Sequence, residues 1–145
     1  MNLICTKATP TGRVSIYNDR LIPATALFHI GDNGYQKKLI MEDLFDASSP
    51  LSSESKKEIK LYSDANDSII LAFENTYLTE KEDKTLQRLK ENISEYNTLE
   101  QNILSTWPTH QPQDLAKLES SFEDMVKLSI GMFINALMSE IRPKL

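Results

Sequence analysis

The chain has 145 residues, 40% of them apolar, and a formal net charge of -5. That length suits a single domain, and the acidic balance argues against a nucleic-acid partner, which would require a basic surface. No apolar run approaches the roughly 18 residues of a membrane-spanning helix, and a single cysteine excludes both an internal disulfide framework and a cysteine-based zinc site.

The first predicted helix extends over residues 13–46 and contains a proline, Pro23. An interior proline removes a hydrogen bond and clashes with the preceding turn, so it either starts a helix or bends one. A helix beginning at Pro23 would have Ile22 as its N-cap, and isoleucine is among the poorest caps. The apolar stripe also continues through Pro23 without a change of phase; its members are Val14, Tyr17, Leu21, Ala24, Phe28 and Tyr35. We therefore predict one helix kinked at Pro23, preceded by a tail at residues 1–12.

Three breaks separate this helix from three more, and they lie at residues 46–50, 78–79 and 105–112. Ser52 is a suitable N-cap for the second helix. Thr79 and Glu82 have the spacing of a capping box, in which the threonine hydroxyl accepts from the amide of Glu82 and the glutamate reaches back. Because this box starts the third helix directly after the second ends, we expect the two helices to be antiparallel neighbours.

Each of the three later segments repeats apolar residues at helical spacing, with one polar residue on the stripe. The stripes are Ile59, Tyr62, Asn66, Ile69 and Phe73 in the second segment, Leu86, Leu89, Ile93, Tyr96, Glu100 and Ile103 in the third, and Leu115, Leu118, Phe122, Met125, Ser129 and Met132 in the fourth. Long helices with short connections predict an all-α, antiparallel up-down-up-down four-helix bundle over residues 13–145, with both chain ends at the same end.

Two stretches are similar to one known family. The first is YNDRLIP, residues 17–23, within a longer segment at residues 16–28, and the second is YLTEKE, residues 77–82. The first resembles the first helix of the four-helix-bundle sensor domains of bacterial methyl-accepting chemotaxis receptors, where a tyrosine, an arginine and a mid-helix proline recur as Y-x-D-R-L-x-P-x-x-x-L. The second resembles the corner between that family's second and third helices. The resemblance covers about residues 13–142 of this chain.

This resemblance implies an extracytoplasmic ligand-sensing domain of a bacterial transmembrane signalling receptor, of the chemotaxis-receptor or sensor-kinase type. Such domains lie on the periplasmic side between two transmembrane helices and form homodimers. They bind a small organic or amino acid, or a binding protein, and pass binding to the membrane as a helix displacement. No flanking membrane segment is present in this sequence. We therefore expect either a part of a membrane-anchored parent or an unusual soluble member.

Three tyrosines are predicted to reach one level of the bundle when the helices are folded about their turns. They are Tyr35, Tyr62 and Tyr96, and Phe122 is expected beside them. One interpretation is an aromatic platform for a ligand. We favour the other, an aromatic core layer whose hydroxyl groups reach the surface.

One turn further along, Gly31 and Asn66 are predicted at neighbouring core positions, with Ser129 approaching from the fourth helix. A missing side chain beside a polar one is compatible with a small polar ligand cavity. The favoured alternative is that Asn66 makes a hydrogen bond that fixes helix register. A further candidate is Arg20, whose guanidinium is suited to a carboxylate ligand. For Arg20 we favour an exposed charge or a salt bridge within the bundle.

Two other functions compete with the sensor hypothesis. A histidine phosphotransfer bundle would need an exposed mid-helix histidine with a lysine nearby, and His29 with Lys37 is a thin match. A structural or adaptor bundle would act through protein partners. We predict that the chain is not an enzyme and uses no cofactor or metal, because paired carboxylates, a nucleophile–base spacing and the common cofactor motifs are all missing from the sequence.

Overall fold

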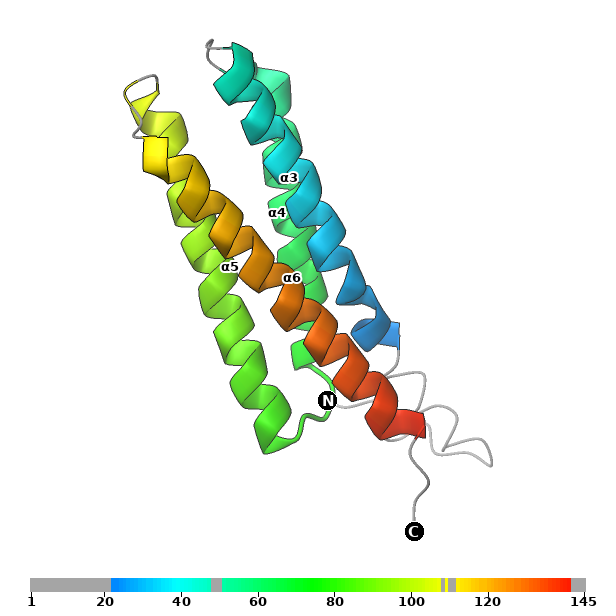
Figure 1. Cartoon of the computed structure of the whole chain (residues 1–145). Helices are drawn as coiled ribbons and strands as arrows, with labels where there is room; N and C mark the ends of the chain where they lie inside the picture. Colours follow the sequence, from blue (N-terminus) through cyan, green and yellow to red (C-terminus); the bar gives the residue numbers. More distant parts are fainter. Residues whose placement is uncertain (1–21, 48–50, 108, 110–111, 142–145) are drawn as a thin grey trace.

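The computed structural model describes residues 22–47, 51–107, 109 and 112–141. These residues form four long helices, α3 (Phe28–Ala47), α4 (Ser53–Glu74), α5 (Glu80–Thr106) and α6 (Pro112–Ile141). Consecutive helices run antiparallel, so that the start of α3, the α4–α5 corner and the end of α6 lie at one end (Figure 1). The described residues contain no strand. The predicted all-α four-helix bundle is therefore confirmed.

Side-chain caps begin α4 and α5 where the sequence predicted them. The Ser52 hydroxyl accepts a hydrogen bond from the amide of Ser55 at 3.1 Å. At the start of α5, the Thr79 hydroxyl accepts from the amide of Glu82 at 3.1 Å, and the Thr79 amide donates to Oε1 of Glu82 at 3.0 Å. This reciprocal pair satisfies two amides that the first turn of a helix otherwise leaves free, and it fixes the direction in which α5 leaves the corner.

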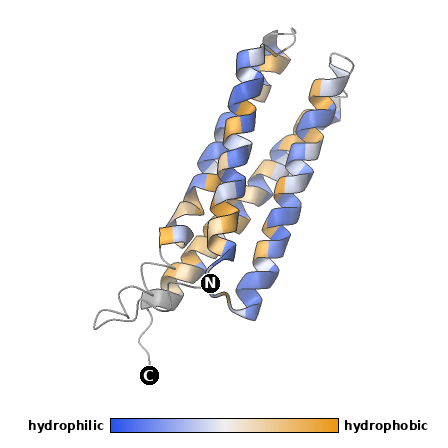
Figure 2. Ribbon diagram, turned by 180° about the vertical axis from the view of Figure 1, so that it is seen from behind, coloured by the Kyte–Doolittle hydropathy of each residue, from blue (hydrophilic) through white to orange (hydrophobic). Residues whose placement is uncertain are grey.

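The core is built from the inward faces of all four helices. The predicted α5 stripe is buried in full, from Leu86 to Ile103, and the α6 stripe is buried at Leu118, Met125, Ser129 and Met132. Apolar residues concentrate toward the end where α3 begins and α6 ends, whereas α5 is hydrophilic over most of its visible surface (Figure 2). No helix within the described ranges is long and apolar enough to cross a membrane.

The first helix differs from the prediction in the phase of its buried face. Its buried residues are Ala24, Leu27, Ile30, Gly34, Lys37, Met41 and Leu44, whereas the predicted stripe members Phe28 and Tyr35 are 49% and 47% exposed. The cause is a tight turn at Leu27, where the amide of Leu27 bonds to the carbonyl of Ala24 and the amide of Ile30 bonds to the carbonyl of Leu27. Two successive three-residue steps overwind the chain, so each later inward-facing residue lies one position earlier in the sequence than predicted.

The interruption that the structure describes is this turn at Leu27, downstream of Pro23. Residues 22–26 are helical before it. The predicted kink at Pro23 is not confirmed, because the residues whose carbonyl groups would face the proline ring lie outside the described residues. The same holds for the predicted tail at residues 1–12 and for the helical start at residue 13.

Neighbouring helices are packed unequally. Helix α3 packs along α4 and α6, and α5 packs along α6, but α4 and α5 touch sparsely. The approach of α3 to α6 is close at Gly34, where an added Cβ would lie 3.0 Å from Sδ of Met125. The bundle is therefore two helical hairpins, α3–α4 and α5–α6, that are joined firmly along α3–α6 and loosely along α4–α5.

Candidate functional site

A lysine lies in the centre of this apolar bundle. The one-residue shift of the α3 face places Lys37 inward, and its side chain is only 2% exposed. Its ammonium donates to Oγ of Ser63 on α4 at 2.8 Å and to Oδ1 of Asn97 on α5 at 2.7 Å. Since a buried charge is costly unless it is paired, this position requires a buried counter-charge.

Glu100 on α5 supplies that counter-charge. Its side chain is fully buried, and its Oε1 lies 3.2 Å from Nζ of Lys37. Burial raises the pKa of the Glu100 carboxyl and lowers that of the Lys37 ammonium, while their mutual attraction opposes both changes. The pair joins α3 to α5, which are diagonal partners in the bundle, and so it connects the two hairpins through the core.

Tyr96 completes the surroundings of the lysine. Its ring is fully buried, and Nζ of Lys37 lies 4.9 Å from the ring centroid, within the range of a cation–π contact. Burial raises the pKa of the Tyr96 hydroxyl, with the negative charges of Glu100 and Glu42 adding to the effect. The hydroxyl therefore stays protonated, and among the described residues it has no hydrogen-bond partner.

A second polar contact lies beside this centre. Asn66 on α4 is buried, and its Oδ1 accepts a hydrogen bond of 2.9 Å from Nδ2 of Asn33 on α3. This bond ties the two helices of one hairpin at a defined register. This contact agrees with the favoured interpretation, in which Asn66 makes a hydrogen bond that fixes helix register.

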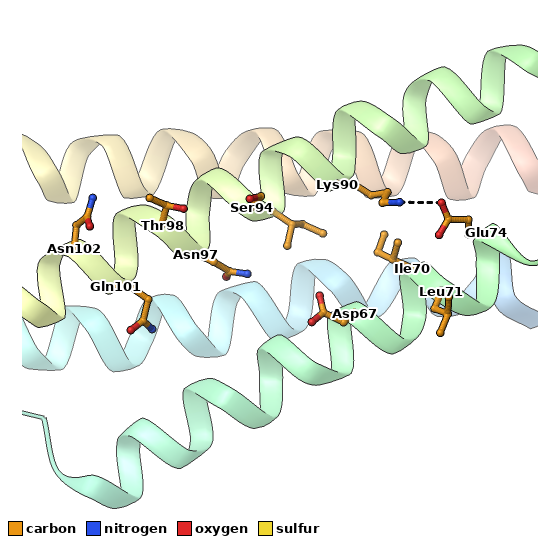
Figure 3. Close-up of a pocket in the computed structure, with 11 residues that line it drawn as sticks. Asp67, Ile70, Leu71, Glu74, Lys90, Ser94, Asn97, Thr98, Gln101 and Asn102 are labelled. Atoms are coloured by element: carbon orange, nitrogen blue, oxygen red, sulfur yellow. Dashed lines mark hydrogen bonds and ion pairs between the residues drawn. The ribbon is translucent and has the colours of Figure 1, made fainter.

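A groove opens on the loosely packed side of the bundle and leads toward the buried pair. It lies between α4 and α5 and has a volume of ≈ 700 Å³. Asp67 and Asn97 face the gap from opposite helices, with Ile70 and Leu71 on one side of them and Gln101 on the other (Figure 3). A smaller cavity of ≈ 300 Å³ adjoins it, shares Asn97 and Gln101, and is also lined by Ser63 and Glu100. The interior polar layer therefore borders cavities on the α4–α5 side of the bundle.

The other predicted site residues do not gather at this groove. Tyr35 lies on the outside, with its ring 6.4 Å from that of Phe122, and Tyr62 is half-buried. Gly31 is half-buried and faces Val126 of α6, and Ser129 is buried with its hydroxyl donating to the carbonyl of Val126 at 3.2 Å. The predicted layer of three tyrosines is wrong for Tyr35, because the shifted α3 face puts Lys37 inward instead. Arg20 lies outside the described residues.

The lysine was missed from the sequence although a signal for it existed. Glu100 falls on the α5 stripe, and a carboxylate on an otherwise apolar stripe calls for a cation from a facing helix. Lys37 stands two positions beyond Tyr35, off the assumed stripe. Its partners Ser63 and Asn97 flank the α4 and α5 stripes and carry no distinguishing pattern of their own.

The polar groups at this centre provide hydrogen bonds and charge. The described residues hold no group of three or more histidine, cysteine, aspartate or glutamate side chains placed to bind a metal ion. His29 is exposed and lies 3.7 Å from a carboxylate oxygen of Asp32 on its own helix. The groups available to a ligand at this centre are a buried carboxylate, amide groups and an apolar wall.

Comparison with known proteins gives one match. A family described as a four helix bundle sensory module for signal transduction matches residues 1–139. No curated protein and no solved structure matches the chain. The match covers the predicted first helix and α3 to α5 completely, together with nearly all of α6.

Proposed function

This chain belongs to the family of four helix bundle sensory modules for signal transduction, and we propose that it senses a small ligand outside the cytoplasmic membrane for a transmembrane receptor. A sensory module of this family is generally not an enzyme. The proposed receptor is of the chemotaxis or sensor-kinase type, and the membrane is reached through segments that flank the module.

The observation that carries the proposal is the groove between α4 and α5 above a buried polar layer. Lys37 comes from one hairpin, and Asn97 and Glu100 come from the other. A ligand in the groove would compete for or add to these contacts, and so it would favour one arrangement of the two hairpins over another. Because α3 begins and α6 ends at the same end of the bundle (Figure 1), a relative shift of the hairpins is delivered there as a helix displacement.

We also propose that the module works as a homodimer through the outer seam of α3 and α6. Phe28 is half exposed, and its ring centroid lies 5.8 Å from that of Phe133, while Tyr35 and Phe122 form a second ring pair along the same seam. Ile134 and Met138 are further exposed apolar residues of α6, at 49% and 48% exposure. Exposed aromatic rings that lie along one seam are typical of protein interfaces.

The test of sensing is a hybrid receptor. The chain is placed between the two transmembrane helices of a receptor with a known kinase-control output, and output is recorded while candidate ligands are added outside the cell. A ligand-dependent change in output supports the proposal. If the hybrid reaches the membrane, yet output stays constant across amino acids, organic acids and amines, and a pull-down instead recovers a stable protein partner, the adaptor hypothesis replaces it.

A further inference from the structure

The hydrogen-bonding capacity of the buried lysine is used up inside the protein. An ammonium group has three protons to donate, and Nζ of Lys37 has three acceptors within reach, on Ser63, Asn97 and Glu100. Lys37 therefore has no proton left for a ligand. A ligand with a carboxylate group would therefore receive no hydrogen bond from Lys37.

Glu100, in contrast, has hydrogen-bond acceptor capacity that the protein does not use. Its carboxylate is fully buried, and Oε1 faces the ammonium of Lys37 at 3.2 Å, whereas Oε2 has no hydrogen-bond partner among the described residues. Only Oε1 lies against the lysine, and the side chain lines the cavity that adjoins the groove. A buried acceptor without a donor is costly. Glu100 thus offers a ligand an N–H acceptor that the protein itself does not fill.

The charges near the lysine also favour a cation. Asp67 lines the groove and lies close enough to Lys37 to act on it electrostatically. The carboxylates of Asp67 and Glu100 thus both act on the Lys37 ammonium, and these three groups have one negative charge in excess. Two further lysines that line these spaces already have carboxylate partners: Lys90 in the groove pairs with Glu74 at 2.8 Å, and Lys60 in the smaller cavity pairs with Asp64 at 2.9 Å. Lys56 also lines the smaller cavity, but it lies two helical turns before Ser63, about 10 Å along the axis. A cation beside Asn97 on the Asp67 side therefore avoids Lys56.

Apolar side chains form part of the wall next to this position. Ile70 follows Asp67 by about one turn on α4 and lies to one side of the charged centre (Figure 3). Ile93 precedes Asn97 by about one turn on the antiparallel α5, which puts it on the same side. Leu71, which is 58% exposed, extends this surface. A ligand whose charged group lies between Asp67 and Glu100 would bury a short apolar body there.

We propose that the α4–α5 groove and the smaller cavity that adjoins it together bind a small amphipathic primary amine, with its ammonium donating to Glu100 and Asp67 and its apolar body packed on Ile70, Ile93 and Leu71. This proposal rests on the proposed sensory function and specifies the ligand class. It requires no bond to form or break. The ligand gains two charge-assisted hydrogen bonds and supplies Glu100 with its missing donor.

The test uses three probes of equal length, hexylamine, 1-hexanol and hexanoate, with isothermal titration and thermal shift on the chain of residues 1–145. Hexylamine is expected to bind and to raise the melting temperature, whereas 1-hexanol and hexanoate are not. Methylamine, which lacks the apolar body, is expected to bind at least about tenfold more weakly, since several buried methylene groups are lost.

Three variants locate the site. Asp67→Asn is a surface change that leaves the fold intact, and Glu100→Gln removes the buried acceptor charge. Each is expected to weaken hexylamine binding by about tenfold or more, the effect of replacing a charge-assisted hydrogen bond by a neutral one. The control is Glu95→Gln, an exposed carboxylate of the same helix that faces the α5–α6 side, and it is expected to leave binding unchanged.

The outcomes separate this inference from the proposed function. Binding of hexanoate as tight as that of hexylamine, hexylamine binding that is insensitive to Asp67→Asn, or no binding of any probe would each overturn the amine proposal. If the hybrid receptor nevertheless responds to another compound, the sensory function stands with a different ligand. Amine binding at the groove without any response of the hybrid receptor would support the site and count against the sensory role.

Discussion

Replacing Lys37 by methionine is expected to destabilise the bundle by about 3–5 kcal/mol, the usual cost of leaving one member of a buried ion pair alone. The magnitude follows from the contacts that disappear. Glu100 is fully buried and loses the counter-charge that Lys37 supplies, while the acceptors on Ser63 and Asn97 lose the same donor. Methionine has nearly the same length as the lysine stem, so the change leaves little empty volume. For a chain of this size the melting temperature should fall by about 10 °C or more.

The assay is urea unfolding followed by circular dichroism, applied to a double-mutant cycle with Glu100→Gln. The double variant Lys37→Met with Glu100→Gln carries no buried charge at this position, so it should recover most of the stability that each single variant loses. A loss below about 1 kcal/mol for Lys37→Met is the size of an exposed salt bridge, and it would refute the burial argued for this pair.

The two single variants should respond to pH in opposite directions. Without Lys37, the desolvated Glu100 has a folded-state pKa still further above its ordinary value of 4.5. The unfolding free energy of Lys37→Met should therefore be closest to wild type near and below that value and should fall as pH rises through the raised pKa. Without Glu100, the pKa of Lys37 drops further below its ordinary value of 10.5. The Glu100→Gln variant should therefore gain stability as pH rises toward 10.5 and lose it as pH falls. Parallel pH profiles for the two variants would contradict this account.

Three further predictions concern packing, capping and assembly. Gly131 has open space around an added Cβ, whereas Gly34 has Sδ of Met125 at 3.0 Å. Gly131→Ala should thus raise the unfolding free energy by up to about 1 kcal/mol, and Gly34→Ala should gain less or lose stability; equal urea midpoints would argue against the close α3–α6 approach. Thr79→Ala should cost about 1 kcal/mol through loss of the capping box, and an unchanged midpoint would show that the box is dispensable. Phe28→Glu should shift sedimentation velocity toward the monomer while Tyr77→Glu, at an 82% exposed corner residue, should not; an unaffected dimer would remove the α3–α6 seam as its interface.

Much of the fold was predictable because α4, α5 and α6 carry local signals that agree with one another. The α5 stripe, its capping box at Thr79 and the short corner before it all specify the same helix, and each was confirmed. Such agreement between pattern, cap and turn makes a helix readable without any knowledge of its neighbours. The bounds of α5 accordingly differ from the prediction by a residue or so.

The site was harder to predict because it depends on phase. A stripe continued at steps of three and four from Ala24 leads to Phe28 and Tyr35, while the overwound turn at Leu27 leads to Gly34 and Lys37. No residue at this turn is a strong helix breaker, so the extra three-residue step leaves no mark in the sequence. A one-position error in α3 then puts Tyr35 inward in place of Gly34 and leaves Lys37 off the inward face, so the ion pair is missed.

The placement of this ion pair bears on how a small ligand could move a long bundle. Along α3–α6 the hairpins are joined by close apolar packing, which resists continuous deformation. On the opposite side, the Lys90–Glu74 pair joins α5 to α4 at 2.8 Å near the corner, and the diagonal contact from Lys37 to Asn97 and Glu100 joins α3 to α5 through the core. A buried ion pair defines geometry while adding little net stability, because desolvation offsets much of its attraction. Under the proposed sensory function, a ligand whose affinities for two arrangements of these polar groups differ by a few kcal/mol would be sufficient to change which arrangement is populated.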